Sequence, residues 1–137
     1  MNSPSKSFKI SIPSLIDNIN IVESFIENAC DENKISEDIY GNILIAVTEA
    51  VNNAIKHGNK EDRKKLVDLE VESSEQKVTF KIKDEGNGFD FKHLNDPTSP
   101  ENLEEEGGRG IFLMKHLSDE VNFLEEGRKV ELTFYIL

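Results

Sequence analysis

Apolar and polar side chains alternate along five short stretches of the chain, and this period of two residues predicts β-strands. The first stretch covers residues 8–12 and stops at Pro13, a residue that cannot continue a strand inside a sheet. The other four are residues 66–71, 78–82, 121–124 and 130–136. Residues 73–76 and Gly127 have turn-forming types. The pattern therefore predicts one hairpin in the middle of the chain and another at its end.

Three other segments place apolar residues every three or four positions, which predicts helices with one buried face. Ser14 is positioned to cap a first helix that runs through Cys30. Ser36 opens a second and longer helix, Gly58 ends it, and a third helix begins near Gly110. The apolar faces of these helices comprise Leu15, Ile19, Val22 and Ile26, then Tyr40, Leu44, Val47, Val51, Ala54 and Ile55, then Ile111, Met114 and Leu117.

Residues 84–109 contain several glycines and prolines and no sustained period, so they predict one long loop. Irregular segments of this length in a compact domain are usually functional or disordered. The order is strand, helix, helix, strand, strand, loop, helix, strand, strand. It predicts the α+β class, as a two-layer α/β sandwich in which a mixed, mostly antiparallel sheet carries the helices on one face. No repeat or linker divides the chain, so we expect a single domain over residues 1–137.

Composition narrows the possible functions. The chain has 27 acidic against 16 basic residues, a net charge of −11, which disfavours sequence-independent binding to nucleic acid or to an anionic membrane. Its single cysteine, Cys30, excludes an intramolecular disulfide and a cysteine-based zinc site. The apolar stretches are too short to span a bilayer, and the N-terminus does not resemble a signal segment. We therefore expect a cytoplasmic protein.

Three groups of residues carry candidate chemistry. On the second predicted helix, Glu49 and Asn53 are four residues apart and so lie on one face. Such a pair could form part of a solvated polar surface, but a carboxylate and an amide oxygen are also ligands that Mg²⁺ accepts. The second group, residues 84–88 (Asp-Glu-Gly-Asn-Gly), directly follows a strand. Its glycines permit close backbone approach to a flat ligand, and Asp84 could accept a hydrogen bond from an exocyclic amine.

The third group, residues 107–110 (Gly-Gly-Arg-Gly), opens the third helix. Backbone N–H groups at a helix N-terminus can bind an anion, and Arg109 could add a charged contact to phosphate. Each group alone has an ordinary structural explanation. In this order, however, residues 48–58, 84–88 and 107–110 resemble the N, G1 and G2 boxes of the GHKL ATPases. The chain is most similar to the anti-sigma-factor serine/threonine kinases of that superfamily.

The resemblance implies roles for individual residues. Glu49 would be the general base that takes the proton from an attacking hydroxyl, and Asn53 would be a ligand of Mg²⁺. Asp84 would accept a hydrogen bond from the adenine amine. The glycines of the second group, Gly86 and Gly88, would shape the floor under the adenine. The phosphates would lie beneath a lid formed by residues 89–106 and would be held by Gly108, Arg109 and Gly110.

One position departs from the family pattern. The family often has a threonine near the start of its last strand, close to the adenine. Here residues 128–131 are Arg-Lys-Val-Glu, and the nearest threonine is Thr133. The adenine contacts of this strand therefore stay open.

The leading hypothesis is an ATP- and Mg²⁺-dependent serine/threonine kinase that sequesters a sigma factor and phosphorylates an anti-sigma antagonist. The resemblance also suggests a homodimer. The alternative is a non-catalytic switch module in which nucleotide binding orders the partner surface. A detached histidine-kinase catalytic domain is less favoured, because the sequence contains no dimerisation helix with a phosphoacceptor histidine.

Charge within the predicted loop adds one expectation. Residues 84–106 hold eight carboxylates against Lys92 alone. We expect Glu101 and Glu104, Glu105 and Glu106 to point outward, to keep an empty lid mobile by repulsion, and to offer a negative surface to basic partners.

Overall fold

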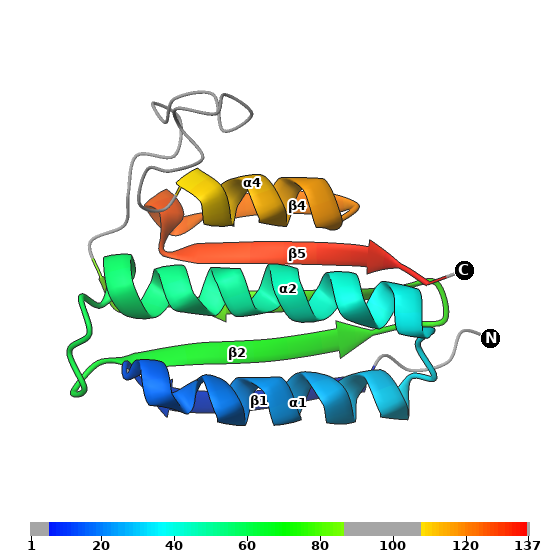
Figure 1. Ribbon diagram of the computed structural model, residues 1–137, viewed down its shortest axis with the longest axis horizontal. Coiled ribbons are helices and arrows are strands. Elements are labelled where there is room, and N and C mark those ends of the chain that lie inside the picture. The colour runs from blue at the N-terminus through cyan, green and yellow to red at the C-terminus, as the bar shows by residue number, and fades with distance from the viewer. Residues whose placement is uncertain (1–5, 87–107, 137) are drawn as a thin grey trace.

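Five strands form one sheet in the order β1-β2-β3-β5-β4 (Figure 1). The computed structural model describes residues 6–86 and 108–136. The strands are β1 Lys6–Pro13, β2 Leu66–Ser73, β3 Lys77–Lys83, β4 Glu120–Leu124 and β5 Lys129–Tyr135. All four strand pairings within this part of the chain are antiparallel. Both hairpins are present where the alternating pattern predicts them.

Three longer helices cover one face of this sheet, with α2 between α1 and α4 (Figure 1). They are α1 Ile19–Glu32, α2 Glu37–Asn53 and α4 Gly108–Leu117. Two short helical turns flank the longer helices: η1 Ile16–Asn18 precedes α1, and the π-helical η2 Ala54–Gly58 follows α2. A third turn, η4 Glu125–Gly127, joins β4 to β5. The predicted two-layer α+β fold is confirmed.

Two helix starts differ from the prediction. The first helix begins at Ile19, and Ser14 does not cap it. The Ser14 hydroxyl is completely buried and donates a 2.7 Å hydrogen bond to the carbonyl of Lys65, at the start of β2. The third helix begins at Gly108, two residues before the predicted position. The first difference has a long-range cause, because the hydrogen bond to Lys65, 51 residues away, fixes Ser14.

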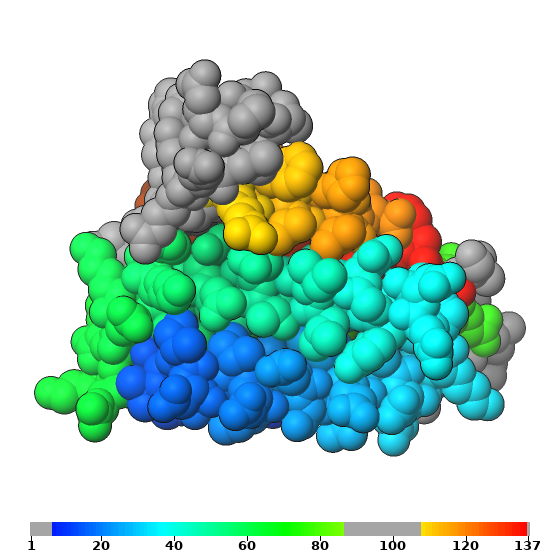
Figure 2. Space-filling view, viewed as in Figure 1, coloured from blue at the N-terminus to red at the C-terminus, as the bar shows by residue number. Residues whose placement is uncertain are grey.

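The core lies between the sheet and the helices. Alternate residues of each central strand are buried, as Val78, Phe80 and Ile82 are on β3. The buried arc of α2 is wider than predicted, since this helix has neighbours on both sides as well as the sheet beneath it (Figure 2). Its buried residues are Ile43, Ala46, Val47, Ala50 and Val51. The predicted core residues Tyr40 and Leu44 are only partly buried.

The opposite face of the sheet is polar. Its side chains pair across strands, as in the hydrogen bond from Ser11 to Asp68 and the 2.9 Å ion pair of Lys81 with Glu72. Among the helices of the described residues, none has the length and apolar character needed to cross a membrane.

Phe80 tests the packing of this core. Its ring is completely buried and meets the ring of Phe134 edge-on, with 6.3 Å between the centroids. We expect Phe80→Ala to lower the free energy of unfolding by about 3–5 kcal/mol, because it leaves a cavity in a close-packed layer. The matched control is Phe8→Ala, since Phe8 is 41% exposed. Urea unfolding of both variants measures the difference, and equal losses would contradict this account of the core.

Candidate functional site

The first and third groups of candidate residues meet where α2 ends and α4 begins (Figure 1). A Cβ atom built on Gly110 would lie 2.9 Å from Nδ2 of Asn53 and 3.2 Å from Oε2 of Glu49. With glycine at this position, the first turn of α4 approaches the polar face of α2 without displacing these two side chains. Neither Glu49 nor Asn53 is fully exposed. The pair is therefore part of an interhelical contact and not an isolated solvated stripe.

Glu49 and Asn53 keep their polar atoms available at this contact. Neither side chain forms a hydrogen bond or an ion pair with another residue of the described ranges. Gly108 and Arg109 begin α4, whose first N–H groups lack partners within the helix. Arg109 is exposed. Two acceptors with no partner among the described residues and a set of backbone donors thus lie side by side.

The second group forms a separate, tightly packed junction. Asp84 follows β3, and its backbone N–H donates a 2.9 Å hydrogen bond to the carbonyl of Arg128. Its Oδ1 accepts a 2.8 Å hydrogen bond from the N–H of Gly86. A Cβ atom on Gly58 would overlap the Asp84 carboxylate, and one on Gly86 would overlap the Gly58 carbonyl. The close approach of these segments therefore requires glycine at both positions.

Asp84 is a buried carboxyl group, with only 7% of its surface exposed. Burial raises its pKa above the ordinary value, while the Gly86 N–H and the charges of Arg128 and Lys65 act in the opposite direction. A carboxylate in this position gains from each further hydrogen-bond donor that it can accept. Asp84 is thus suited to accept a hydrogen bond from a ligand.

A buried network beside Asp84 is absent from the sequence prediction. Asn59 is 1% exposed, and its Nδ2 donates hydrogen bonds to Oγ of Ser14 at 2.8 Å and to the carbonyl of Leu66 at 3.0 Å. Its Oδ1 accepts a 2.8 Å hydrogen bond from the N–H of Glu85. In the sequence Asn59 looks like any asparagine after a helix-ending glycine. The partners that distinguish it are brought together only by the fold.

Several expectations fall on residues 87–107, which lie outside the described residues. They concern Gly88, the lid over residues 89–106 and the outward direction of its acidic side chains.

Thr133 lies away from this site. It pairs with Thr79 in the sheet, and the two hydroxyls are 3.1 Å apart. Lys83 pairs with Lys129, so Thr133 is four residues further along β5, or about 13 Å at the usual strand rise. Thr133 therefore does not replace the family threonine near Asp84.

Comparison with known proteins decides the family. Residues 12–134 match the model of the histidine kinase-like ATPase domain. The chain belongs to this family. Among its relatives is the serine-protein kinase RsbW of Staphylococcus aureus strain JH9, with 28% identity over 144 residues that cover 99% of this chain and 91% of the relative. The protein of the same name from strain MSSA476 is 29% identical over the same shares.

A solved structure supports the fold. The structure of the RsbU and RsbW domains of Rv1364c from Mycobacterium tuberculosis matches with a TM-score of 0.67 and 16% identity. The match covers 97% of this chain and about a third (32%) of the solved chain. At this identity the likeness concerns the fold alone. The predicted GHKL architecture and the similarity to anti-sigma kinases are confirmed.

Membership of this ATPase family implies the use of ATP, normally with Mg²⁺, and the donors present fit that ion. Groups of three or more His, Cys, Asp or Glu residues that could enclose a metal are not found in the described ranges. Mg²⁺ is commonly bound through one or two protein oxygens, with water and phosphate oxygens at the other positions. The amide of Asn53, beside the start of α4, suits this mode of binding.

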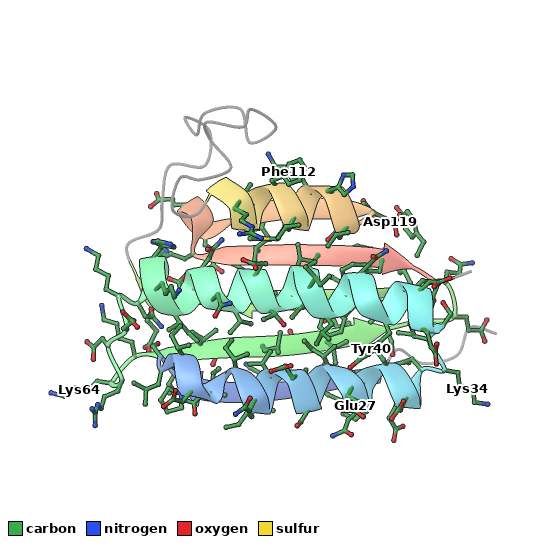
Figure 3. The ribbon with its side chains drawn as sticks, viewed as in Figure 1. Glu27, Lys34, Tyr40, Lys64, Phe112 and Asp119 are labelled. Carbon is green, nitrogen blue, oxygen red and sulfur yellow. The ribbon has the colours of Figure 1, made fainter. Side chains whose placement is uncertain are left out.

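Other candidate residues have ordinary roles in this member of the family. Cys30 is buried, and burial, with a smaller contribution from Asp31, raises the pKa of its thiol to about 11. It is a core residue. The ring of His116 stacks on Phe112, on the side of α4 away from α2, with 5.5 Å between the centroids (Figure 3).

Asn59→Ala tests the buried network. The substitution leaves the Glu85 N–H and the Leu66 carbonyl without their buried partner, so we expect a loss of about 1–3 kcal/mol in the free energy of unfolding. Combined with Ser14→Ala in a double-mutant cycle, it should show coupling of at least about 0.5 kcal/mol. The exposed Asn20→Ala variant is the control. Additive losses in urea unfolding would show that the network does not act as a unit.

The raised pKa of Asp84 predicts a pH dependence. The folded state binds this proton more tightly than the unfolded state, so ionised Asp84 costs stability as the pH rises above its ordinary value of 3.8. An asparagine side chain does not ionise, and its oxygen can still accept the hydrogen bond from the N–H of Gly86. We therefore expect Asp84→Asn to gain stability over the wild type between pH 4 and pH 7 in urea unfolding. The exposed Asp17→Asn variant is the control for the loss of one negative charge. If the difference in the free energy of unfolding between Asp84→Asn and the wild type does not change with pH, the raised pKa of Asp84 is refuted.

Proposed function

We propose that the chain is an ATP- and Mg²⁺-dependent serine/threonine kinase that binds a sigma factor and phosphorylates an anti-sigma antagonist. One observation carries the proposal. Glu49 and Asn53 lie against the glycine-rich start of α4, with Gly110 as the point of closest approach, and neither is paired with another described side chain. In this proposal the carboxylate is the base, the amide is a ligand of Mg²⁺, and the N–H groups at the start of α4 bind phosphate. The similarity to serine-protein kinase RsbW supports the same activity.

Each side chain has a definite part in the proposed transfer. The carboxylate of Glu49 accepts the proton of a serine or threonine hydroxyl as its oxygen forms a bond to the γ-phosphorus of ATP. The bond between that phosphorus and the β–γ bridging oxygen breaks, and ADP leaves with the electron pair. A carboxylate base in such a position accelerates the reaction about 10²–10⁴-fold. Asn53 would hold Mg²⁺, which would neutralise part of the phosphate charge when bound.

The remaining site residues bind the nucleotide in this proposal. Asp84 accepts a hydrogen bond from the adenine amine, and Gly86 and Gly88 lie beneath the base. The phosphates are held by Gly108, Arg109 and Gly110 at the start of α4. The junction of Gly58, Asp84 and Gly86 is tightly packed, because backbone and carboxylate fill its space. Such a junction fixes the adenine relative to Glu49.

A non-catalytic nucleotide switch is the second candidate, and one feature favours it. No described side chain orients the Glu49 carboxylate by a hydrogen bond, whereas a general base is normally held in place. The two candidates share the nucleotide site and differ in the chemistry at Glu49.

Glu49→Gln separates these candidates. We expect the variant to bind Mg-ATP about as tightly as the wild type, because the amide keeps the shape of the side chain. Transfer of labelled phosphate to an anti-sigma antagonist should fall about 10²–10⁴-fold, since the amide cannot take the proton. Calorimetry with and without Mg²⁺ measures binding, and phosphate transfer from labelled ATP measures activity.

Two further variants serve as controls for binding and for activity. The exposed Glu23→Gln variant on α1 should change neither quantity. Asp84→Asn should weaken ATP binding about 10–100-fold, the cost of losing a hydrogen bond to a charged acceptor. ATP binding without any phosphate transfer by the wild type would support the switch module. A wild type that binds no ATP would refute both candidates.

A further inference from the structure

A second surface lies at the opposite edge of the sheet from α4. In the described residues β1 is an edge strand that pairs only with β2, so alternate N–H and C=O groups on its outer side lack strand partners. Beside it α1 forms the wall of an open groove of about 730 Å³. The groove is lined by Phe8, Phe25, Asn28, Ala29, Asp31 and Glu32. None of these residues belongs to the nucleotide site.

The floor of this groove is apolar and accessible. Phe8 is 41% exposed on β1, and Phe25 is only partly buried on α1. Ile21, one turn before Phe25, is 50% exposed and continues the apolar stripe along the helix. Leaving these large side chains in water costs free energy that an apolar partner would recover.

The segment that forms one wall of the groove is strongly acidic, and two of its carboxylates, Asp31 and Glu32, line the groove itself. Five carboxylates and no Lys or Arg lie between Ile10 and Asn33, and Glu27 is among them (Figure 3). Asp31 and Glu32 occupy the last turn of α1, which has no basic residue, and neither forms an ion pair with another described residue. Carboxylates there meet the negative end of the helix dipole, an arrangement that disfavours the isolated helix.

The negative charge extends over the neighbouring surface of α1. Burial raises the pKa of the Tyr40 hydroxyl on α2, and the charges of Glu27, Asp31 and Glu23 raise it further. The side chain of Lys34, just beyond α1, is directed outward at the end of the molecule (Figure 3). The end of the groove near Asp31 and Glu32 is thus a region where a cation is favoured.

We propose that this groove binds an extended, basic segment of a partner protein. The segment adds a strand to the outer edge of β1, places an apolar side chain between Phe8 and Phe25, and sets Lys or Arg against Asp31 and Glu32. The open edge of β1 favours an extended backbone, and Phe8 and Phe25 favour an apolar anchor. Asp31 and Glu32 favour basic residues at one end of the segment. The proposal does not depend on kinase activity or on nucleotide.

Charge also argues against a second copy of this chain as the occupant. Two chains joined through their β1 edges would bring two α1 helices together on the same face of the sheet. Each helix carries Glu23, Glu27, Asp31 and Glu32 and no basic residue. The carboxylates of the two helices would repel one another, whereas these carboxylates attract a basic segment.

The test uses a synthetic nine-residue peptide as the probe. It alternates threonine with valine, has phenylalanine at its centre and carries two lysines at one end. Fluorescence anisotropy of the labelled peptide against the full chain measures the dissociation constant. We expect the double variant Asp31→Lys/Glu32→Lys to weaken binding at least about tenfold. Glu23→Lys/Glu27→Lys has the same charge change on the same helix outside the groove lining, and it should change binding less than about threefold.

Two further measurements separate strand addition from charge attraction. N-methylation of one alternate set of peptide N–H groups should abolish binding, and methylation of the other set should be tolerated, because only one set faces β1. Phe8→Ser should weaken binding, while Ile45→Ser, at a similarly exposed apolar residue on α2, should not.

Three results would overturn the proposal. The first is an equal loss in the two double charge variants, which would show non-specific attraction. The second is tolerance of methylation in both sets. The third is a dimer in sedimentation that Phe8→Ser dissociates and the peptide cannot displace, since that result would assign the groove to a second copy.

Discussion

The hydrogen bonds of the buried Asn59 amide are the interaction on which the arrangement of the proposed nucleotide site depends. The amide joins the start of β2, the residues after β3 and Ser14 after β1 through three hydrogen bonds. A buried polar group is stabilising only when its hydrogen bonds are satisfied, so this amide tolerates few alternative arrangements of its neighbours. Glu85 is thereby fixed, and with it the adjacent Asp84, whose carboxylate would otherwise avoid burial. The position of the Asp84 carboxyl is thus determined by a residue outside the proposed ligand contacts.

Glycines provide the complementary constraint, since the site lies where segments approach more closely than side chains allow. Gly58 and Gly86 bring the end of η2 against the end of β3, and Gly110 brings α4 against the polar face of α2. Backbone atoms near a ligand supply donors and acceptors whose positions cost no side-chain entropy. The sheet contributes indirectly, because its register places Asp84 opposite Arg128 and keeps Thr133 in the middle of β5.

Local periodicity was enough to predict the strands, the order of elements and the layer architecture, because each depends on which residues face the core. Periodicity did not predict features that depend on contacts between segments far apart in the sequence. Ser14 has the type of a helix cap, yet its hydroxyl bonds to Lys65, 51 residues away. The predicted apolar face of the second helix omits Ala46 and Ala50, which are buried because a helix with neighbours on both flanks buries a wider arc. The site residues were predicted by family resemblance, and the proximity of Glu49 to Gly110 needed the fold.

The acidic surplus of the chain has a structural distribution that net charge alone does not reveal. On the open face of the sheet, carboxylates face cations across strands, as Glu72 faces Lys81. On α1 no ion pair with another described residue opposes them, and Asp31 and Glu32 stand at the helix end where the dipole disfavours them. Departures from local preference of this kind concentrate at functional surfaces, where another interaction offsets their cost. Because α1 lies beyond α2 from α4, a partner held there would leave the space beside Glu49 open. Partner binding and phosphate transfer could then use different faces of one small domain.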